Sequence, residues 1–272
     1  GGWWAGAGSD KTIIRNIAGG SVFISQGIAV YKFEGITFQT QAYGDEPCFV
    51  INNVIDKGGR NCKGQHFFDC RFVGGSIAFG LGLETGPQVD WHYHDNCTFE
   101  KAKLGYAIGC YNNLQEIVVN SRFVDNVIDA GHTTLGQGGG GTAGFYNCVT
   151  TGNRGKFLEL HLQGTALWYF NNVRGVVPGV MDQDESQLAL MMFFDRCHFR
   201  SADPTQPLVR SAYGGSIFFN RSRLENGRVQ LYGDQGPKTF LSMFSDLRGP
   251  DESTAEGSSA IVQIPWRPAG KR

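Results

Sequence analysis

The sequence predicts an all-β fold in which one chain coils through many short strands. Two features of the chain support this. A unit of about 25 residues recurs along most of the 272 residues, and no segment shows the apolar periodicity of a helix. Glycine is abundant, at 39 residues, and aromatic residues reach 12%, which indicates a packed fold with many turns rather than a disordered tract.

The repeated unit is clearest at two aligned positions that lie two residues apart. Residues two apart on a strand share a face, so both positions are expected to point inward. The first position is occupied by small or apolar residues in most units: Ile36, Cys70, Cys97, Ser121, Cys148, Asn172, Cys197, Ser222 and Ser245. The second is mostly aromatic or apolar: Phe38, Phe72, Phe99, Phe123, Thr150, Arg174, Phe199, Leu224 and Leu247. We expect Phe72, Phe99, Phe123 and Phe199 to form one buried stack.

A third aligned position, directly before the first, predicts a tight bend. Asn and Asp tolerate the left-handed backbone conformation that such a bend requires, and their amides can bond one another. This position holds Asp69, Asn96, Asn120, Asn147, Asn171, Arg196 and Arg221.

Each unit contains three short strands separated by turns, without the crossover helix that an ordinary parallel α/β sheet needs. Stacking such units places like strands in register, and parallel crossovers are almost always right-handed. The prediction is a right-handed parallel β-helix of about nine turns in one domain, residues 1–272. Residues 1–27 are the expected entry segment, 28–248 the regular turns, and 249–272 the last strand and tail.

The recurring sequence patterns N-x-C-x-F and N-x-S-x-F resemble those of the right-handed parallel β-helix superfamily of pectate-lyase-like proteins, and the resemblance covers about residues 28–265. That superfamily includes polysaccharide lyases, glycoside hydrolases, carbohydrate epimerases, phage tailspikes and adhesins. The resemblance therefore implies a polysaccharide or cell-surface glycan as partner and a location outside the cell or on a virion. The polygalacturonase motifs NTD, DD, GHG and RIK and the lyase motif RxPxxR are absent, so the resemblance implies no particular catalytic residue.

Charge and hydropathy exclude two classes of partner. The chain has 24 Lys and Arg against 25 Asp and Glu, so no basic field is available for nucleic acid. No run of 18 apolar residues exists, so membrane insertion is not expected either. An open coil end exposes unpaired strand edges, which predicts capping by chain segments beyond this sequence or by subunits, for example in a homotrimer.

Cysteine, histidine and glycine patterns each have an ordinary structural interpretation. The four cysteines at the first aligned position are expected to be buried free thiols. His92 and His94 have a spacing that could bind a metal, although His94 also occupies a position held by aromatic residues in other units. The GxGxxG match at residues 136–141 precedes no helix and is interpreted as a turn. No cofactor is expected, except Ca²⁺ if the chain is a lyase.

A candidate catalytic site lies on the third strand of each unit. Alternation places Glu159, His161 and Gln163 outward, and counting back from the first aligned position pairs Glu159 with Asp184. Carboxylates at such range can divide into acid and base, as glycoside cleavage requires. Glu159 and Asp184 are the expected carboxylate pair, with Asp182 as a supporting acid and His161 orienting the substrate or sharing the proton load.

Further residues are expected to bind substrate around that pair. They are Arg210 one turn above, Asp129 and His132 one turn below, Gln163, and Tyr232 as an aromatic surface for a sugar ring. An alternative is a solvated loop in which Glu159 pairs with Lys156 or Arg210. For a lyase, outward basic residues would suit an anionic polymer: Arg71, Arg122, Arg196, His198, Arg221 and Arg223. A non-catalytic β-helix that binds glycan, or forms a rigid adhesin or tail-fibre segment, is the second function class.

Overall fold

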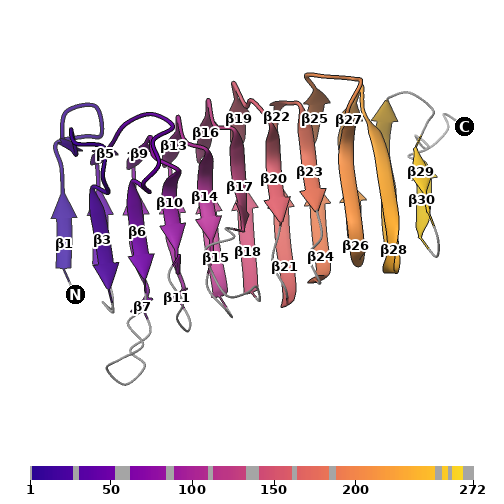
Figure 1. Cartoon of the computed structure of the whole chain (residues 1–272), viewed down its shortest axis with the longest axis horizontal. Helices are drawn as coiled ribbons and strands as arrows, with labels where there is room; N and C mark the ends of the chain where they lie inside the picture. Colours follow the sequence, from indigo (N-terminus) through magenta and orange to yellow (C-terminus); the bar gives the residue numbers. More distant parts are fainter. Residues whose placement is uncertain are drawn as a thin grey trace, which may run out of the picture.

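The computed structural model describes residues 2–26, 31–52, 62–83, 89–109, 113–132, 141–160, 164–183, 188–248, 253–256 and 259–265. In these ranges the chain is a right-handed parallel β-helix with three strands per turn, as predicted (Figure 1). It has about eight turns, close to the nine expected. Within the described ranges, no helix is long and apolar enough to cross a membrane.

Strands of successive turns form three parallel ladders. The first contains β1 (Gly2–Ala5), β4 (Tyr31–Glu34), β8 (His66–Phe68), β12 (Tyr93–Asp95), β15 (Asn113–Val119), β18 (Gly141–Tyr146), β21 (Gly164–Asn171), β24 (Leu188–Asp195), the later parts of β26 (Pro207–Asn220) and β28 (Arg228–Arg248), and β30 (Ala260–Pro265). The second contains β2 (Ile13–Arg15), β5 (Thr37–Gln39), β9 (Arg71–Val73), β13 (Thr98–Glu100), β16 (Arg122–Val124), β19 (Val149–Thr151), β22 (Arg174–Val177), β25 (His198–Ser201), β27 (Arg223–Glu225) and the end of β28.

The third ladder contains β3 (Phe23–Gln26), β6 (Phe49–Asn52), β10 (Ile77–Leu81), β14 (Leu104–Ile108), β17 (Ile128–His132), β20 (Lys156–Leu160), β23 (Gly179–Gln183), the first parts of β26 and β28, and β29 (Thr254–Ala255). A separate small sheet pairs β7 (Cys62–Lys63) with β11 (Val89–Asp90). In Figure 1 the third ladder faces the viewer and the second follows the upper edge.

The interior is filled by aromatic side chains that stack along the axis, because the register places like residues on top of one another. Phe33 stacks on Phe67 with ring centroids 5.0 Å apart, and Phe67 stacks on His94 at 4.6 Å. Farther along, Phe194 stacks on Phe219 at 4.4 Å. Such pairs add to the free energy gained by apolar burial.

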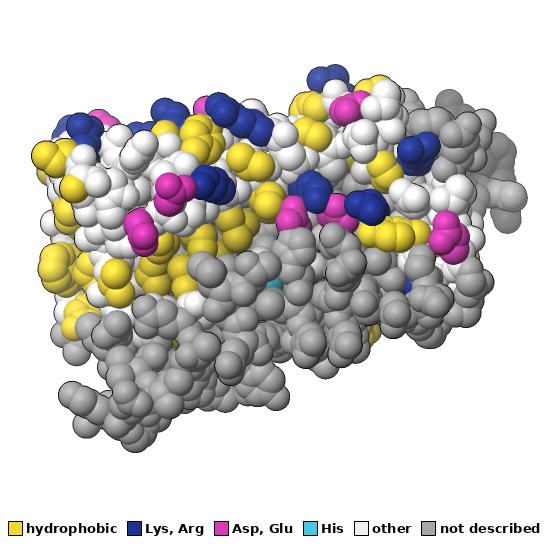
Figure 2. Space-filling model, viewed as in Figure 1, with side chains coloured by type: hydrophobic (Ala, Val, Ile, Leu, Met, Phe, Trp, Pro, Cys, Tyr) yellow, Lys and Arg dark blue, Asp and Glu magenta, His cyan; other side chains and the backbone are white. Residues whose placement is uncertain are grey.

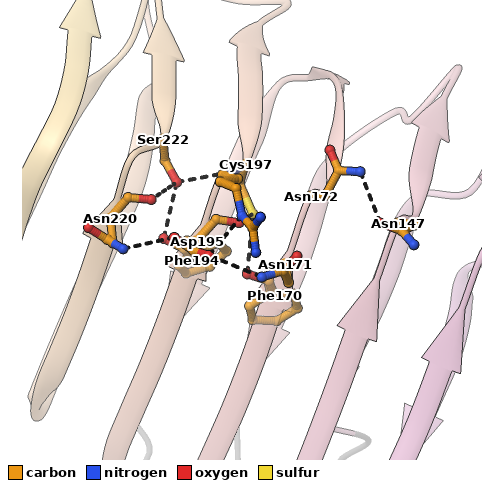
Figure 3. Close-up of polar contacts among 10 residues, drawn as sticks. Asn147, Phe170, Asn171, Asn172, Phe194, Asp195, Cys197, Asn220 and Ser222 are labelled. Atoms are coloured by element: carbon orange, nitrogen blue, oxygen red, sulfur yellow. Dashed lines mark hydrogen bonds and ion pairs between the residues drawn. The ribbon is translucent and has the colours of Figure 1, made fainter.

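The predicted bend has the expected backbone conformation. Asp69, Asn96, Asn120, Asn147, Arg196 and Arg221 all have positive φ. Side-chain amides link neighbouring turns: Asn172 donates to Asn147 at 2.9 Å, and Asn147 donates to Asn120 at 3.2 Å. Figure 3 shows the first of these bonds beside a second group, in which Asn171 and Asn220 both donate to Asp195.

One unit was aligned wrongly by one residue in the prediction. Asn172, not Asn171, has the positive φ of the bend, at 54°, and Val173, not Asn172, is buried at the first aligned position. Gly175 therefore takes the Phe position, pairing with Thr150 and Phe199, and Arg174 points outward. The segment contains two adjacent asparagines that suit the bend equally well, so only the burial of Val173 decides between them.

The predicted phenylalanine stack forms, with a break in the middle. Phe72, Phe99, Phe123 and Phe199 are fully buried, and the Phe99 and Phe123 centroids are 5.2 Å apart. Thr150 and Gly175 interrupt the row before Phe199. Phe157 of β20 occupies this space from the opposite wall, 6.2 Å from Phe123 and 5.2 Å from Phe199.

The four cysteines at the first aligned position are buried free thiols, as predicted: Cys70, Cys97, Cys148 and Cys197. Burial raises the pKa of the Cys148 thiol to about 12 and that of Cys70 to about 11. Since the thiolate is the reactive form, these cysteines serve as core side chains.

Candidate functional site

Charged residues gather on the outer face of the third ladder, over β20, β23 and β26. Glu159 of β20 pairs in register with Asp182 of β23, which pairs with Arg210 of β26. The residues one place before them, Leu158, Met181 and Val209, are buried. Alternation therefore directs the three charged side chains outward.

Ion pairs connect this cluster, which comprises Lys156, Glu159, Asp182 and Arg210. Lys156 Nζ lies 2.6 Å from Asp182 Oδ2 and 3.1 Å from Glu159 Oε2. Arg210 lies 3.6 Å from the same Asp182 oxygen. Burial alone would lower the pKa of Lys156, but the hydrogen bonds and charges of Asp182 and Glu159 raise it. The Lys156 ammonium is consequently held in its charged form.

The cluster borders a hollow of about 300 Å³. Small or rigid residues line it beside the charged ones: Gly155, Pro178, Gly179 and Pro207. Next to it, the Arg210 guanidinium lies 4.5 Å from the centre of the Tyr232 ring. In Figure 2, acidic and basic side chains lie next to one another near the middle of this face.

One oxygen of this cluster lacks a donor. Asp182 Oδ1 is buried and receives no hydrogen bond from any described residue. A covered carboxylate oxygen without a donor is energetically unfavourable. Lys156 and Arg210 both contact the other oxygen, Oδ2, at 2.6 and 3.6 Å, so neither cation supplies a donor to Oδ1.

The structure brings together part of the predicted site. Asp182, rather than Asp184, is the register partner of Glu159, so the predicted alignment was wrong by two residues. One residue of this error comes from the misassigned bend at Asn172, and the other from the loop between the third and first ladders, which is one residue longer after β23 than after β20. Arg210 and Tyr232 lie beside the cluster, and Lys156 pairs with Glu159, the contact named in the alternative interpretation. Asp184, His161 and Gln163 lie outside the described residues.

Asp129 lies in the interior and not on this face. It is fully buried and accepts hydrogen bonds from Asn126, Asn153 and Thr150. Burial raises its pKa to about 7, although these three hydrogen bonds act in the opposite direction. His132 is also buried, with its ring 5.3 Å from Trp168. Both therefore lie behind the charged cluster, inside the coil.

The His92 and His94 pair is interior as well. His94 is fully buried against Phe67, as its aromatic position predicted, and burial lowers its pKa. His92 Nδ1 lies 2.9 Å from Glu116 Oε1, a buried partner that the repeat alignment did not indicate. Across the described ranges, no group of three or more His, Cys, Asp and Glu side chains could hold a metal ion.

The outward basic residues fall into two groups. Arg71, Arg122, His198 and Arg223 lie on the second ladder at equivalent positions. Arg196 and Arg221 lie in the bend. Arg174, predicted to point inward, belongs to the first group.

Comparison with protein-family models, curated proteins and solved structures gives no match. The β-helix fold is shown by the coordinates, and the more specific relation to pectate-lyase-like proteins stays a prediction.

Proposed function

We propose that the protein binds a polysaccharide in the hollow on the third ladder, outside the cell or on a virion surface. The observation that carries this proposal is Asp182, which borders the hollow and has one buried carboxylate oxygen, Oδ1, without a hydrogen-bond donor among the described residues. Sugar hydroxyls are donors of suitable size. The aromatic ring of Tyr232 beside Arg210 offers an adjacent apolar surface for a sugar ring.

The charge of the site favours a neutral glycan. Two cationic and two anionic side chains pair with one another, so the cluster has little net charge. Paired charged groups and a few convergent polar atoms fix ligand orientation in carbohydrate-sized hollows.

The test is a glycan array followed by calorimetric titration of the neutral oligosaccharides that bind. We expect Tyr232→Ala and Glu159→Gln to weaken binding about tenfold each, since each removes one contact with the sugar. The matched control is Tyr169→Ala, which removes an exposed tyrosine from the first ladder. Absence of neutral-glycan binding, or an equal loss in the control, would contradict the proposal.

Glycoside hydrolysis is a second candidate, favoured by the shared contact of Glu159 and Asp182 with Lys156. Glu159 Oε2 and Asp182 Oδ2 lie 3.1 and 2.6 Å from the same Lys156 Nζ, so these two oxygens are close to each other. A short separation of the two carboxyl groups suits a retaining mechanism. Hydrolysis also needs one carboxyl group that donates a proton, whereas Glu159 and Asp182 are both engaged in ion pairs with Lys156. Binding without cleavage is therefore the primary proposal.

A reducing-end assay on polysaccharides that bind distinguishes the two candidates. Hydrolysis predicts product release by the wild type and its loss in both Glu159→Gln and Asp182→Asn. Asp184→Asn tests the pair expected from the sequence. Absence of product from the wild type would exclude the hydrolytic candidate and leave binding intact.

A further inference from the structure

Four arginines recur at every second turn on the outer face of the second ladder. Register places them at one equivalent position, with uncharged or weakly basic residues on the turns between. The order along the ladder is Arg71, Thr98, Arg122, Val149, Arg174, His198 and Arg223. Because adjacent strands are about 4.8 Å apart, successive arginines are spaced by about 10 Å along the axis. We call these four residues the arginine row.

The two ends of the arginine row have acidic partners and the middle does not. Arg71 lies 2.6 Å from Glu100, and Arg223 lies 2.6 Å from Glu225. Arg122 and Arg174 are exposed, and neither has a carboxylate partner among the residues that the structure describes. Two cationic side chains therefore face solvent without compensation in the centre of the face.

Glu225 already interacts with several cationic side chains. It contacts His198 at 3.1 Å as well as Arg223. Desolvation would raise its pKa, but the hydrogen bond with His198 and the charges of Arg223, His198 and Arg200 lower it. The single carboxylate of Glu225 thus interacts with two arginines and a histidine, so the cationic side chains outnumber the acidic ones and the local electrostatic potential stays positive.

A hollow of about 380 Å³ lies beside the centre of the row. Arg174, His198, Arg200 and one carboxylate, Glu225, border it, and its other residues include Thr151, Gly152 and Gly175. Gly175 stands at the inward-facing Phe position, where a Cβ atom would clash with Thr150 Cγ2. The hollow thus lies next to the cationic side chains and has room for a sugar ring.

We propose that this face binds an acidic polysaccharide carrying about one anionic group per disaccharide, with the polymer lying along the arginine row. The spacing of the arginines along the axis determines which class of ligand we propose. A double-stranded nucleic acid carries one charge per about 1.7 Å, far denser than cationic groups about 10 Å apart. A disaccharide unit has about the length of two turns, so its acidic groups can meet successive guanidinium groups. Arginine suits carboxylate and sulfate groups because its planar donors bind them in a bidentate manner.

The site is separate from the hollow on the third ladder, so each can be tested without the other. Titration with hyaluronan octasaccharide, which has one carboxylate per disaccharide, is expected to show binding. Carboxyl-reduced hyaluronan should bind at least tenfold more weakly. Keratan sulfate oligosaccharides, in which the acidic group is a sulfate, tell which acid is preferred, and binding of either class supports the proposal.

The decisive variant is Arg122→Gln with Arg174→Gln, which removes the two uncompensated charges from an exposed surface. We expect at least a tenfold loss of hyaluronan affinity. The control, Lys11→Gln with Lys101→Gln, removes two other exposed charges and should stay within twofold. Glu159→Gln should also leave this binding unchanged. Unchanged affinity in the arginine variant, absence of binding to both acidic glycans, or tighter binding of an oligothymidine would overturn the proposal.

Discussion

The outer faces of the second and third ladders belong to the same coil but use charge in opposite ways. On the third ladder, Glu159, Asp182 and Arg210 follow one another on adjacent strands and pair across them. On the second, Arg122 and Arg174 stand two turns apart with Val149 between them. Residues about 5 Å apart can neutralise one another, whereas like charges about 10 Å apart create a field for a partner.

This difference shows that the position of a residue within the repeat matters more than the composition of the surface. A near-zero net charge for the whole chain is compatible with a locally basic face, because the acidic groups are placed elsewhere. Overall charge therefore excludes a binder that depends on a general basic field, but not a local track of regularly spaced arginines.

The largest expected effect concerns Asp129, which is fully buried inside the coil behind the charged cluster of the third ladder. Its pKa is raised from 3.8 to about 7, so its stabilising contribution is complete below about pH 4 and is lost as the pH rises towards 7. The loss is on the order of 4 kcal/mol. Asp129→Asn should remove most of this pH dependence, as measured by denaturant unfolding from pH 4 to 8. A change in glycan affinity without a change in the pH profile would instead place Asp129 at the surface site.

The next effect distinguishes paired from unpaired charges. Asp182→Asn leaves Lys156 and Arg210 with less compensation and is expected to lower the free energy of unfolding by about 1–2 kcal/mol. Arg174→Gln breaks no described ion pair and should change it by less than about 0.5 kcal/mol. Urea unfolding of both variants measures this contrast, and equal costs would remove the distinction between the faces.

The smallest effect is a difference in salt dependence. Raising the salt concentration from about 0.05 to 0.5 M should weaken acidic-glycan binding on the second ladder about tenfold, because screening acts on its exposed arginines. Neutral-glycan binding on the third ladder should change less than about twofold, since its charges pair internally. Calorimetric titrations at both salt concentrations give the change in affinity with salt for each glycan. An equal change for the acidic and the neutral glycan would indicate a single shared site.

The sequence by itself determined the solenoid, its three strands per turn and most of its interior. The evidence was the recurrence of Phe72, Phe99 and Phe123 with a small residue two places earlier, since stacking in register rewards such repetition directly. The left-handed bends were equally predictable, because few residues other than Asn, Asp and Gly adopt that conformation easily.

Only the tertiary structure decided the register where the repeat is ambiguous. Burial of Val173 selected one of two asparagines for the bend, and that choice turned Arg174 outward and completed the arginine row. The same bend and a difference of one residue in loop length placed Asp182 rather than Asp184 beside Glu159, and the closed interior enclosed Asp129. These outcomes depend on how the turns pack on one another, because a shift of one residue exchanges the inner and outer faces of a strand. The spacing of residues within a single repeat does not determine that packing.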